Sequence, residues 1–278
     1  MTTTSTIYPI IGALLASERE LGPNRRWSPV SGGMRGATEQ SAFLEIYRRS
    51  YQDIARIPEL CSVASRDHLV INKFLTNQGF SIQLQPFRSV SDFGTASVLD
   101  LCLKWLVPGT QRTITDDNEV DYKGVHLKSG VTVYNNGVVA ISTGNGDIVY
   151  LKMGEPPADI GDARLDIDRA RPDPAYAGVV FPKVDIDVQP DISWLLGMST
   201  VDQRGHLAYL NQALQQTKFS MDENGATVRS AVAMGISKGR KAVSTPQPFR
   251  INRPFLVVIR RPGLTLPLFT GYMASDPC

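Results

Sequence analysis

The C-terminal stretch PFRINRPFLVVIRRPGLTLPLFTGYMASDP, residues 248–277, decides the fold. Residues 256–259 (LVVI) have no polar face, so both sides of this strand are expected to be buried. Residues 266–271 (LPLFTG) form a second apolar stretch, and residues 261–263 (RPG) between the two are typical of a turn. The chain is therefore predicted to end in a buried β-hairpin.

Residues 218–235, KFSMDENGATVRSAVAMG, form the second informative stretch. If residues 226–235 are extended, their side chains alternate between two faces, because a strand has a period of two. One face then carries only the small or apolar side chains of Ala226, Val228, Ser230, Val232 and Met234. The other face carries the only charge, Arg229, and no proline interrupts the segment. Residues 226–235 are therefore suited to joining a sheet; an ordinary amphipathic strand or helix is the alternative interpretation.

These two stretches together resemble the serpin family. The first is similar to the family's C-terminal signature, in which a basic-Pro-Phe core leads into an apolar strand, a turn and a second buried strand ending in glycine. The matching residues are Phe249, Asn252, Arg253, Pro254, Phe255, Leu256, Ile259, Arg260, Leu268, Phe269, Gly271 and Pro277. The second resembles the family hinge, with matches at Lys218, Asp222, Glu223, Gly225, Ala226 and Thr227. The distance between the two motifs is close to the family spacing for a full reactive loop.

Weaker similarities follow the same order along the chain. Residues 28–31 (SPVS) and 36–40 (GATEQ) resemble two N-terminal landmarks of the family, residues 103–106 (LKWL) resemble its Asn-x-Trp-Val motif, and residues 181–184 (FPKV) resemble its Leu-Pro-Lys-Phe strand. The chain is shorter than family members usually are, and only four residues remain where the family places most of a buried helix. The resemblance is therefore to a compact, divergent serpin-like protein.

The resemblance implies an α+β, serpin-like fold in a single domain over residues 1–278. N-terminal helices are expected to pack on a large mixed or antiparallel β-sheet, with a second C-terminal β-sheet and an exposed reactive loop at about residues 226–248. Residues 1–120 are expected to be mainly helical and residues 121–278 mainly β.

The resemblance also implies a protease inhibitor and not an enzyme. In the family the loop is bait: a protease cleaves it, forms an acyl-enzyme, and the cut loop enters the main sheet as a new strand. The implied hinge residues are Glu223, Gly225, Ala226, Thr227, Val228, Ser230 and Val232. A non-inhibitory binding or structural protein, whose loop does not insert, is the alternative. A hydrolase on the same scaffold is disfavoured because the chain has only three histidines.

The reactive bond is predicted to join Arg240 to Lys241. Counting from the hinge in the family register points to Gly239, and counting back from Phe255 points to Arg240. Arg240 suits a trypsin-like serine protease, which binds a basic side chain with a buried carboxylate. Lys238 and Gly239 are competing positions, and a solvated basic loop tip that no protease is meant to cut is the alternative. A cysteine protease is also a possible target, since it too forms an acyl-enzyme.

Periodicity predicts the remaining elements. Helices are expected over residues 7–21, 38–57 and 95–106, with a short one over residues 191–198. Strands are expected over residues 68–74, 81–87 and 181–188. After residue 122, β-branched segments alternate with the hairpin turn sequences at residues 135–137 (NNG) and 144–146 (GNG). Residues 159–174 are expected to form a loop.

Composition excludes other classes of function. The formal net charge is +2 and basic pairs are scattered, so no nucleic-acid partner is expected. No apolar run reaches the roughly 18 residues of a membrane span. Three cysteines and three histidines, all far apart, provide no metal site or disulfide framework, so no cofactor is expected. Residues 7–16 lack the basic start of a signal peptide, so no clear signal peptide is predicted. The protein is expected to be soluble, and either cytoplasmic or exported by a non-standard route, with the compartment left open. It is also expected to be a monomer.

Overall fold

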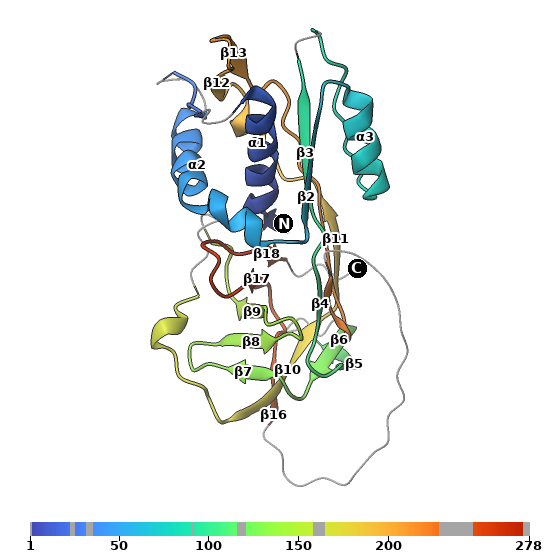
Figure 1. Ribbon diagram of the computed structural model, residues 1–278. Helices are drawn as coiled ribbons and strands as arrows, with labels where there is room; N and C mark the ends of the chain where they lie inside the picture. The colour runs from blue at the N-terminus through green and yellow to red at the C-terminus, as the bar shows by residue number, and fades with distance from the viewer. Residues whose placement is uncertain are drawn as a thin grey trace.

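The computed structural model describes residues 2–22, 26–31, 36–89, 92–115, 121–157, 165–227 and 247–274. Figure 1 shows the helices gathered at one end beside two long strands, with most of the other strands at the opposite end. One large apolar cluster connects the two ends, because it includes Leu14 of the helical part, Leu103 between the two and Phe181 of the strand-rich part.

The first helices follow the predicted periodicity. Helix α1 (Ile7–Leu21) buries Tyr8, Ile11 and Leu14 on one side and ends at Gly22, whose φ of 107° favours glycine. Helix α2 (Ala37–Ser50) runs into the 3-10 helix η1 (Tyr51–Arg56), so the helix expected over residues 38–57 is present with a tightened last turn.

A six-stranded antiparallel sheet contains the C-terminal hairpin. Its order is β1 (Thr3–Ser5), β18 (Phe269–Met273), β17 (Phe255–Arg260), β9 (Ile148–Met153), β8 (Val138–Ser142) and β7 (Val131–Val133). Strand β17 lies between β18 and β9. Val257 and Ile259 join the large core cluster, whereas Leu256 and Val258 join a second cluster with Tyr272. The predicted hairpin is confirmed, and both faces of β17 are covered.

A four-stranded sheet contains β16, the first strand described after the predicted reactive loop. Its order is β16 (Gln247–Arg250), β10 (Tyr176–Pro182), β6 (Asp121–Leu127) and β5 (Thr110–Thr115). Strand β16 is parallel to β10, and the other two pairs are antiparallel. The strand expected over residues 181–188 is divided at Lys183, where the chain leaves this sheet for the next one.

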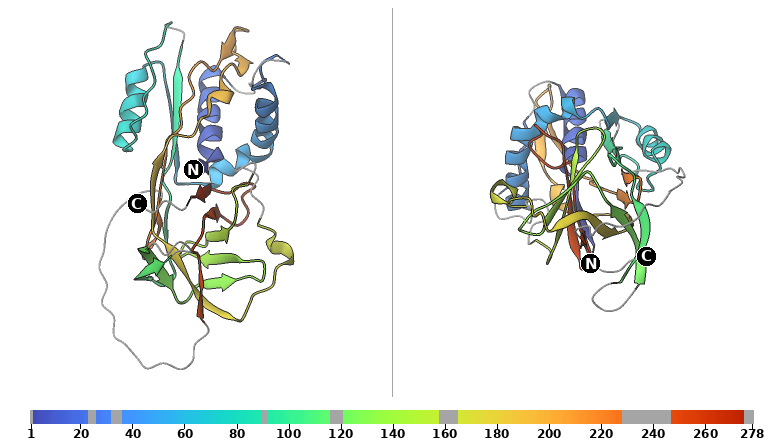
Figure 2. Two further views of the ribbon diagram at one scale, coloured as in Figure 1. Left: turned by 180° about the vertical axis from the view of Figure 1, so that it is seen from behind. Right: turned by 90° about the horizontal axis from the view of Figure 1, so that it is seen from below.

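Residues 225–227 of the predicted hinge belong to another four-stranded sheet, called the main sheet here. Its order is β11 (Val184–Val188), β14 (Thr217–Met221), β15 (Gly225–Thr227) and β4 (Cys102–Lys104). Strand β4 follows β3 (Gly94–Leu99), which pairs with β2 (Leu60–Ser65). Helices α1 and α3 (His68–Asn77) flank opposite sides of the β2–β3 ladder, as Figures 1 and 2 show. Smaller elements are η3 (Ile167–Arg169), η4 (Ser193–Leu195), β12 (Ser199–Val201) and β13 (Leu207–Tyr209).

The helix predicted over residues 95–106 is wrong, because this segment forms β3 and β4. Leu99, Leu101, Leu103 and Trp105 are buried at a period of two, whereas Cys102 is exposed. The apolar residues of the segment fit both the helical period of 3.6 and the strand period of 2. Pairing with β2 and β15 is what selects the strand.

The strand predicted over residues 68–74 is also wrong, because this segment begins helix α3. The Asp67 side chain caps the helix by accepting the backbone N–H of Leu69 at 2.9 Å. Ile71 and Leu75, one turn apart, are the buried residues. Residues 81–87 are extended but pair with no described strand, and their alternation places Ile82 and Leu84 against the apolar cluster of α3.

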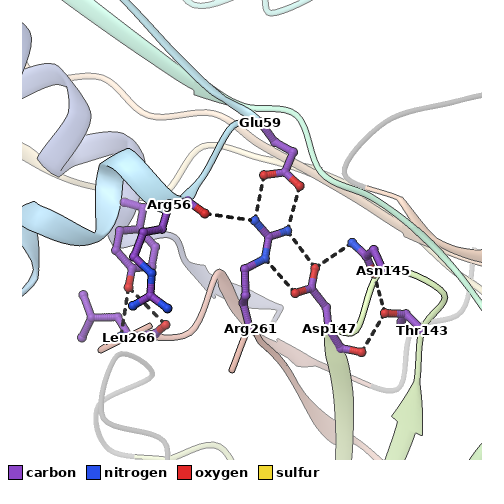
Figure 3. A network of polar contacts seen from close by, with 8 residues as sticks. Arg56, Glu59, Thr143, Asn145, Asp147, Arg261 and Leu266 are labelled. Atoms are coloured by element: carbon purple, nitrogen blue, oxygen red, sulfur yellow. Dashed lines mark hydrogen bonds and ion pairs between the residues drawn. The ribbon is translucent and has the colours of Figure 1, made fainter. Parts of the chain in front are cut away.

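Arg261, in the turn between β17 and β18, joins the helical end of the molecule to the strand-rich end (Figure 3). Its guanidinium donates to both carboxylate oxygens of Glu59, at 2.9 and 2.7 Å, and to both of Asp147, at 2.8 and 2.9 Å. The Asp147 side chain is fully buried in the turn between β8 and β9. The Arg261 hydrogen bonds hold the pKa of Glu59 below its usual value. Two parallel hydrogen bonds on each side fix the geometry of this junction.

Candidate functional site: the hinge and the cavity below it

The first residues of the predicted hinge already form a strand in the main sheet. Strand β15 pairs antiparallel with β14, placing Thr227 opposite Ser220. It pairs antiparallel with β4 on its other side, placing Thr227 opposite Cys102. Strands β14 and β4 are therefore two strand spacings apart, about 9.5 Å, and the hinge lies between them.

Strand β15 has space only for small side chains at its first two residues. A Cβ atom on Gly225 would lie 1.8 Å from the carbonyl oxygen of Leu103. Ala226 is 1% exposed and belongs to the large core cluster. The turn before them is closed by Asp222, whose carboxylate accepts the backbone N–H of Asn224 at 2.7 Å and of Gly225 at 3.2 Å. Glycine followed by alanine therefore matches the space available.

Trp105 holds the turn against β4. Its indole N–H donates to the Asp222 carbonyl at 2.8 Å, and its backbone N–H donates to the Asn224 carbonyl at 3.1 Å. Its ring packs edge-on against Phe181 in the core. The backbone N–H of Gly109 adds a bond of 2.7 Å to the Glu223 carbonyl. The entrance of the hinge is thus fixed by backbone contacts.

Glu223 adds an ionic contact at the same place. Its carboxylate lies 2.6 Å from the Lys183 ammonium, at the point where β10 gives way to β11, and accepts from the Gln111 side chain at 2.5 Å. Burial alone would raise the pKa of Glu223, but the contacts with Lys183 and Gln111 outweigh it and hold that pKa below its usual value. Glu223 therefore ties the hinge to both four-stranded sheets.

A cavity of about 150 Å³ lies between the segments that border the path beyond Thr227, the last residue of β15. Residues 95–99 of β3 line one side, and residues 212–218, which lead into β14, line the other. Ile10, Ala13 and Leu14 of α1 are further lining residues. The lining is mostly apolar side chain, so the cavity is suited to a segment with small or apolar side chains.

Residues 80–87, named the strap here, cover the cavity from the α3 side. Phe80, Ile82 and Leu84 of the strap line the cavity. The side-chain oxygen of Gln216 accepts the backbone N–H of Ser81 at 2.8 Å. The Gln212 side chain both accepts from the backbone N–H of Gln85 at 2.7 Å and donates to its carbonyl at 3.2 Å. Two glutamine amides therefore fasten the strap to the chain that enters β14.

The structure brings together four of the predicted hinge residues, namely Glu223, Gly225, Ala226 and Thr227. The predicted positions Val228, Ser230, Val232, Lys238, Gly239, Arg240 and Lys241 lie outside the described residues. Lys183 and Trp105 fall in segments whose sequence resembles the family, but only the contacts reveal that they hold the hinge. Gln212 and Gln216 have no signal in the sequence, because glutamine is common on surfaces and their partners lie more than 120 residues away.

Among the described helices, none is long and apolar enough to cross a membrane. Within the ranges that the structure describes, no three His, Cys, Asp or Glu side chains gather where they could hold a metal ion.

Comparison with known proteins identifies the architecture. The family model described as serpin (serine protease inhibitor) matches residues 189–276. Among curated proteins, none matches. The solved serpin SRPN18 of Anopheles gambiae is similar at a TM-score of 0.53 and 14% identity, covering 99% of this chain and 92% of that one.

Two longer proteins show the same fold. Serpin48 of the insect Tenebrio molitor is similar at a TM-score of 0.51 and 16% identity, covering 74% of this chain. A serpin of Schistosoma mansoni is similar at a TM-score of 0.51 and 14% identity, covering 76% of this chain. This chain spans 64% of the length of each of them. The likeness confirms the expected α+β serpin-like fold, and the family model matches a segment that contains both sequence motifs except Pro277. The chain therefore has a compact serpin-like fold, and its C-terminal third matches the serpin family model.

Proposed function

We propose that the chain is a protease inhibitor that acts as a suicide substrate, and not an enzyme. A target protease would cut the chain between β15 and β16, and the cut segment would extend β15 inside the main sheet. The added strand would lower the free energy of the inhibitor and trap the acyl-enzyme before it is hydrolysed.

The register of β15 carries this proposal. Thr227 lies opposite Ser220 on β14 and opposite Cys102 on β4. If the same register continued, residues 229–234 would lie opposite residues 213–218 on one side and residues 95–100 on the other. These are the two segments that line the cavity, apart from single residues at their ends. A strand extended from β15 would therefore run into the cavity that lies beyond it.

Ala226 sets which face of that strand would be buried. Its side chain points into the large core cluster, which α1 helps to form. Alternate residues of an extended strand share a face, so Val228, Ser230 and Val232 would point toward α1. Arg229 would point to the opposite face. This is the alternation predicted from the sequence, with the charge kept out of the core.

The sequence, rather than the described structure, supports the cleavage position. The proposed bond joins Arg240 to Lys241, with Lys238 and Gly239 as competing positions. A basic side chain at this bond favours a trypsin-like serine protease. A cysteine protease meets the same chemical need, because it also passes through an acyl-enzyme.

A non-inhibitory binding or structural role is the second candidate, and the strap favours it. Phe80, Ile82 and Leu84 line the cavity that an inserted strand would use, and the two glutamines fasten them there. In this case the loop would be cut without insertion, as any accessible segment can be.

Incubation with trypsin separates the two candidates. Inhibition predicts a covalent complex that survives denaturing electrophoresis and a cut form whose melting temperature is much higher. Ser230→Arg places a charge on the α1 face and should abolish both effects. Ser244→Arg makes the same change beyond the proposed bond and should leave both intact. Cleavage with neither a complex nor a rise in melting temperature in the unsubstituted chain would reject inhibition and support the second candidate.

A further inference from the structure

His126 is a buried side chain on the outer face of the sheet formed by β16, β10, β6 and β5. Its neighbours Val125 and Leu127 point into the large core cluster, so His126 points the opposite way. It lies opposite Thr110 on β5 and Val180 on β10. The residue is only 7% exposed, yet neither ring nitrogen has a hydrogen-bond partner in the structure as described. Buried polar atoms are almost always paired, so this imidazole lacks the hydrogen-bond partner that its burial calls for.

Three exposed cationic residues belong to the same face. Arg112 on β5 lies opposite Gly124, which is two residues from His126 on β6. Lys128 follows His126 at the next position of the same alternation, and Arg250 on β16 lies opposite Val180. Within the described ranges, none of the three cations forms an ion pair.

No negative charge faces His126 from the elements packed against it, as far as the described residues show. Tyr122 of β6 and Lys128, the residue after β6, lie on this face, together with Arg112 of β5 and Arg250 of β16. The residues of β10 on this face, Gly178, Val180 and Pro182, do not titrate. Burial, followed by the charges of Arg112 and Lys128, lowers the pKa of His126. The strand register places Arg112 and Lys128 on the same face as the ring.

We propose that this face is a binding site for a tetrahedral oxyanion, a phosphate or sulfate group, held by His126, Arg112 and Lys128. The oxyanion offers several acceptor oxygens and the negative charge that the face lacks. A guanidinium can bind two of those oxygens at once, and the ammonium adds a third donor. Binding lets His126 take up a proton, so that both of its ring nitrogens donate. The site is separate from the hinge and does not depend on the proposed inhibition.

Histidine NMR tests the proposal in the intact chain. Sodium phosphate and sodium sulfate are titrated at constant ionic strength against chloride, while the ring signals of all three histidines are followed. The expected result is a saturable change at His126 and a rise of its pKa, with His68 and His206 as internal references. Arg112→Gln should weaken the affinity at least fivefold. Arg19→Gln, the same change at an exposed residue of α1, should leave it unchanged.

A second arm distinguishes two sources of the group. Saturation by inorganic sulfate or phosphate identifies a free ion. Saturation only by a sulfated oligosaccharide, with the same dependence on His126 and Arg112, identifies an ester group on a larger molecule. Equal effects of chloride, or equal affinity in His126→Gln and Arg112→Gln variants that retain their circular dichroism, would overturn the proposal.

Discussion

The side-chain oxygen of Gln216 accepts the backbone N–H of Ser81 at 2.8 Å, across 135 residues of sequence. The amide nitrogen of the same side chain donates to Asp187 on β11 at 2.7 Å, so the glutamine is held from both ends. Gln212 binds the backbone of Gln85 in a second contact of the same kind. The strap is therefore fastened over the cavity by side chains of the segment that borders it.

If the proposed function holds, removing the two glutamine side chains that hold the strap should speed insertion of the cut loop. In Gln212→Ala/Gln216→Ala, the rise in melting temperature after cleavage should develop about tenfold faster, because three hydrogen bonds of about 0.5 kcal/mol each no longer hold the strap. The time course of thermal resistance after a trypsin pulse measures this rate. Gln83→Ala, at an exposed residue of the strap itself, is the control. Equal rates in all three proteins would show that the strap is not in the way.

Gly225→Ala should destabilise the native chain by about 2 kcal/mol or more, the range of overpacking in a close-fitting interior. The added Cβ would lie 1.8 Å from the Leu103 carbonyl oxygen, so β15 or β4 must move. Urea unfolding of the uncut protein gives the free energy. Gly144→Ala is the matched control, since its Cβ would meet nothing closer than 3.8 Å. An equal loss of unfolding free energy in both variants would mean that the space around Gly225 is not restrictive.

Arg261→Met should cost about 3 kcal/mol of unfolding free energy. The change leaves the buried Asp147 carboxylate without its cation and removes both bonds to Glu59. Denaturant unfolding measures the loss. Arg260→Met, at the exposed neighbour on β17, should change stability by less than about 0.5 kcal/mol. If the two substitutions cost the same, the junction contributes little to stability.

His126 should make the folded chain less stable as the pH falls, in buffers without phosphate or sulfate. Its pKa is lowered from the usual 6.5 by burial and by the charges of Arg112 and Lys128. Between the two pKa values the unfolded chain therefore binds a proton at this histidine that the folded chain does not bind. Stability is therefore full above about pH 7 and declines as the pH falls through 6.5 toward the lower folded value. Unfolding free energies from pH 8 to pH 5 test this. His126→Gln should flatten the decline, and His206→Gln, at an exposed turn residue, should retain it.

The sequence best predicts the elements whose pattern of apolar residues fits only one kind of secondary structure. Residues 256–259 have no polar face, so only a strand covered on both sides accommodates them, and the C-terminal hairpin follows. Residues 95–106 fit both a helix and a strand, and the choice depends on partners that periodicity does not include. Ala226 is buried, in agreement with the alternation that the sequence predicts from this residue onward.

The rest of the site depends on contacts between distant segments. Lys183 meets Glu223 only because the chain passes between sheets at that residue. Trp105 is recognisable as a core residue, but its indole N–H bond to Asp222 is a tertiary contact without a local pattern. His126 looks like an ordinary strand residue until the register shows which cations share its face.

The pairing of β15 on both edges changes which step would limit a lengthening strand. Starting a new strand is ordinarily the slow event, since several residues must lose their freedom before any ladder bond forms. Here the nucleus exists in the uncut molecule, aligned by Gly225, Ala226 and Thr227. The strand would then lengthen one residue at a time and form hydrogen bonds with the chain on both sides at each step. The rate of elongation would depend on displacing the strap from the cavity and not on nucleation of the strand.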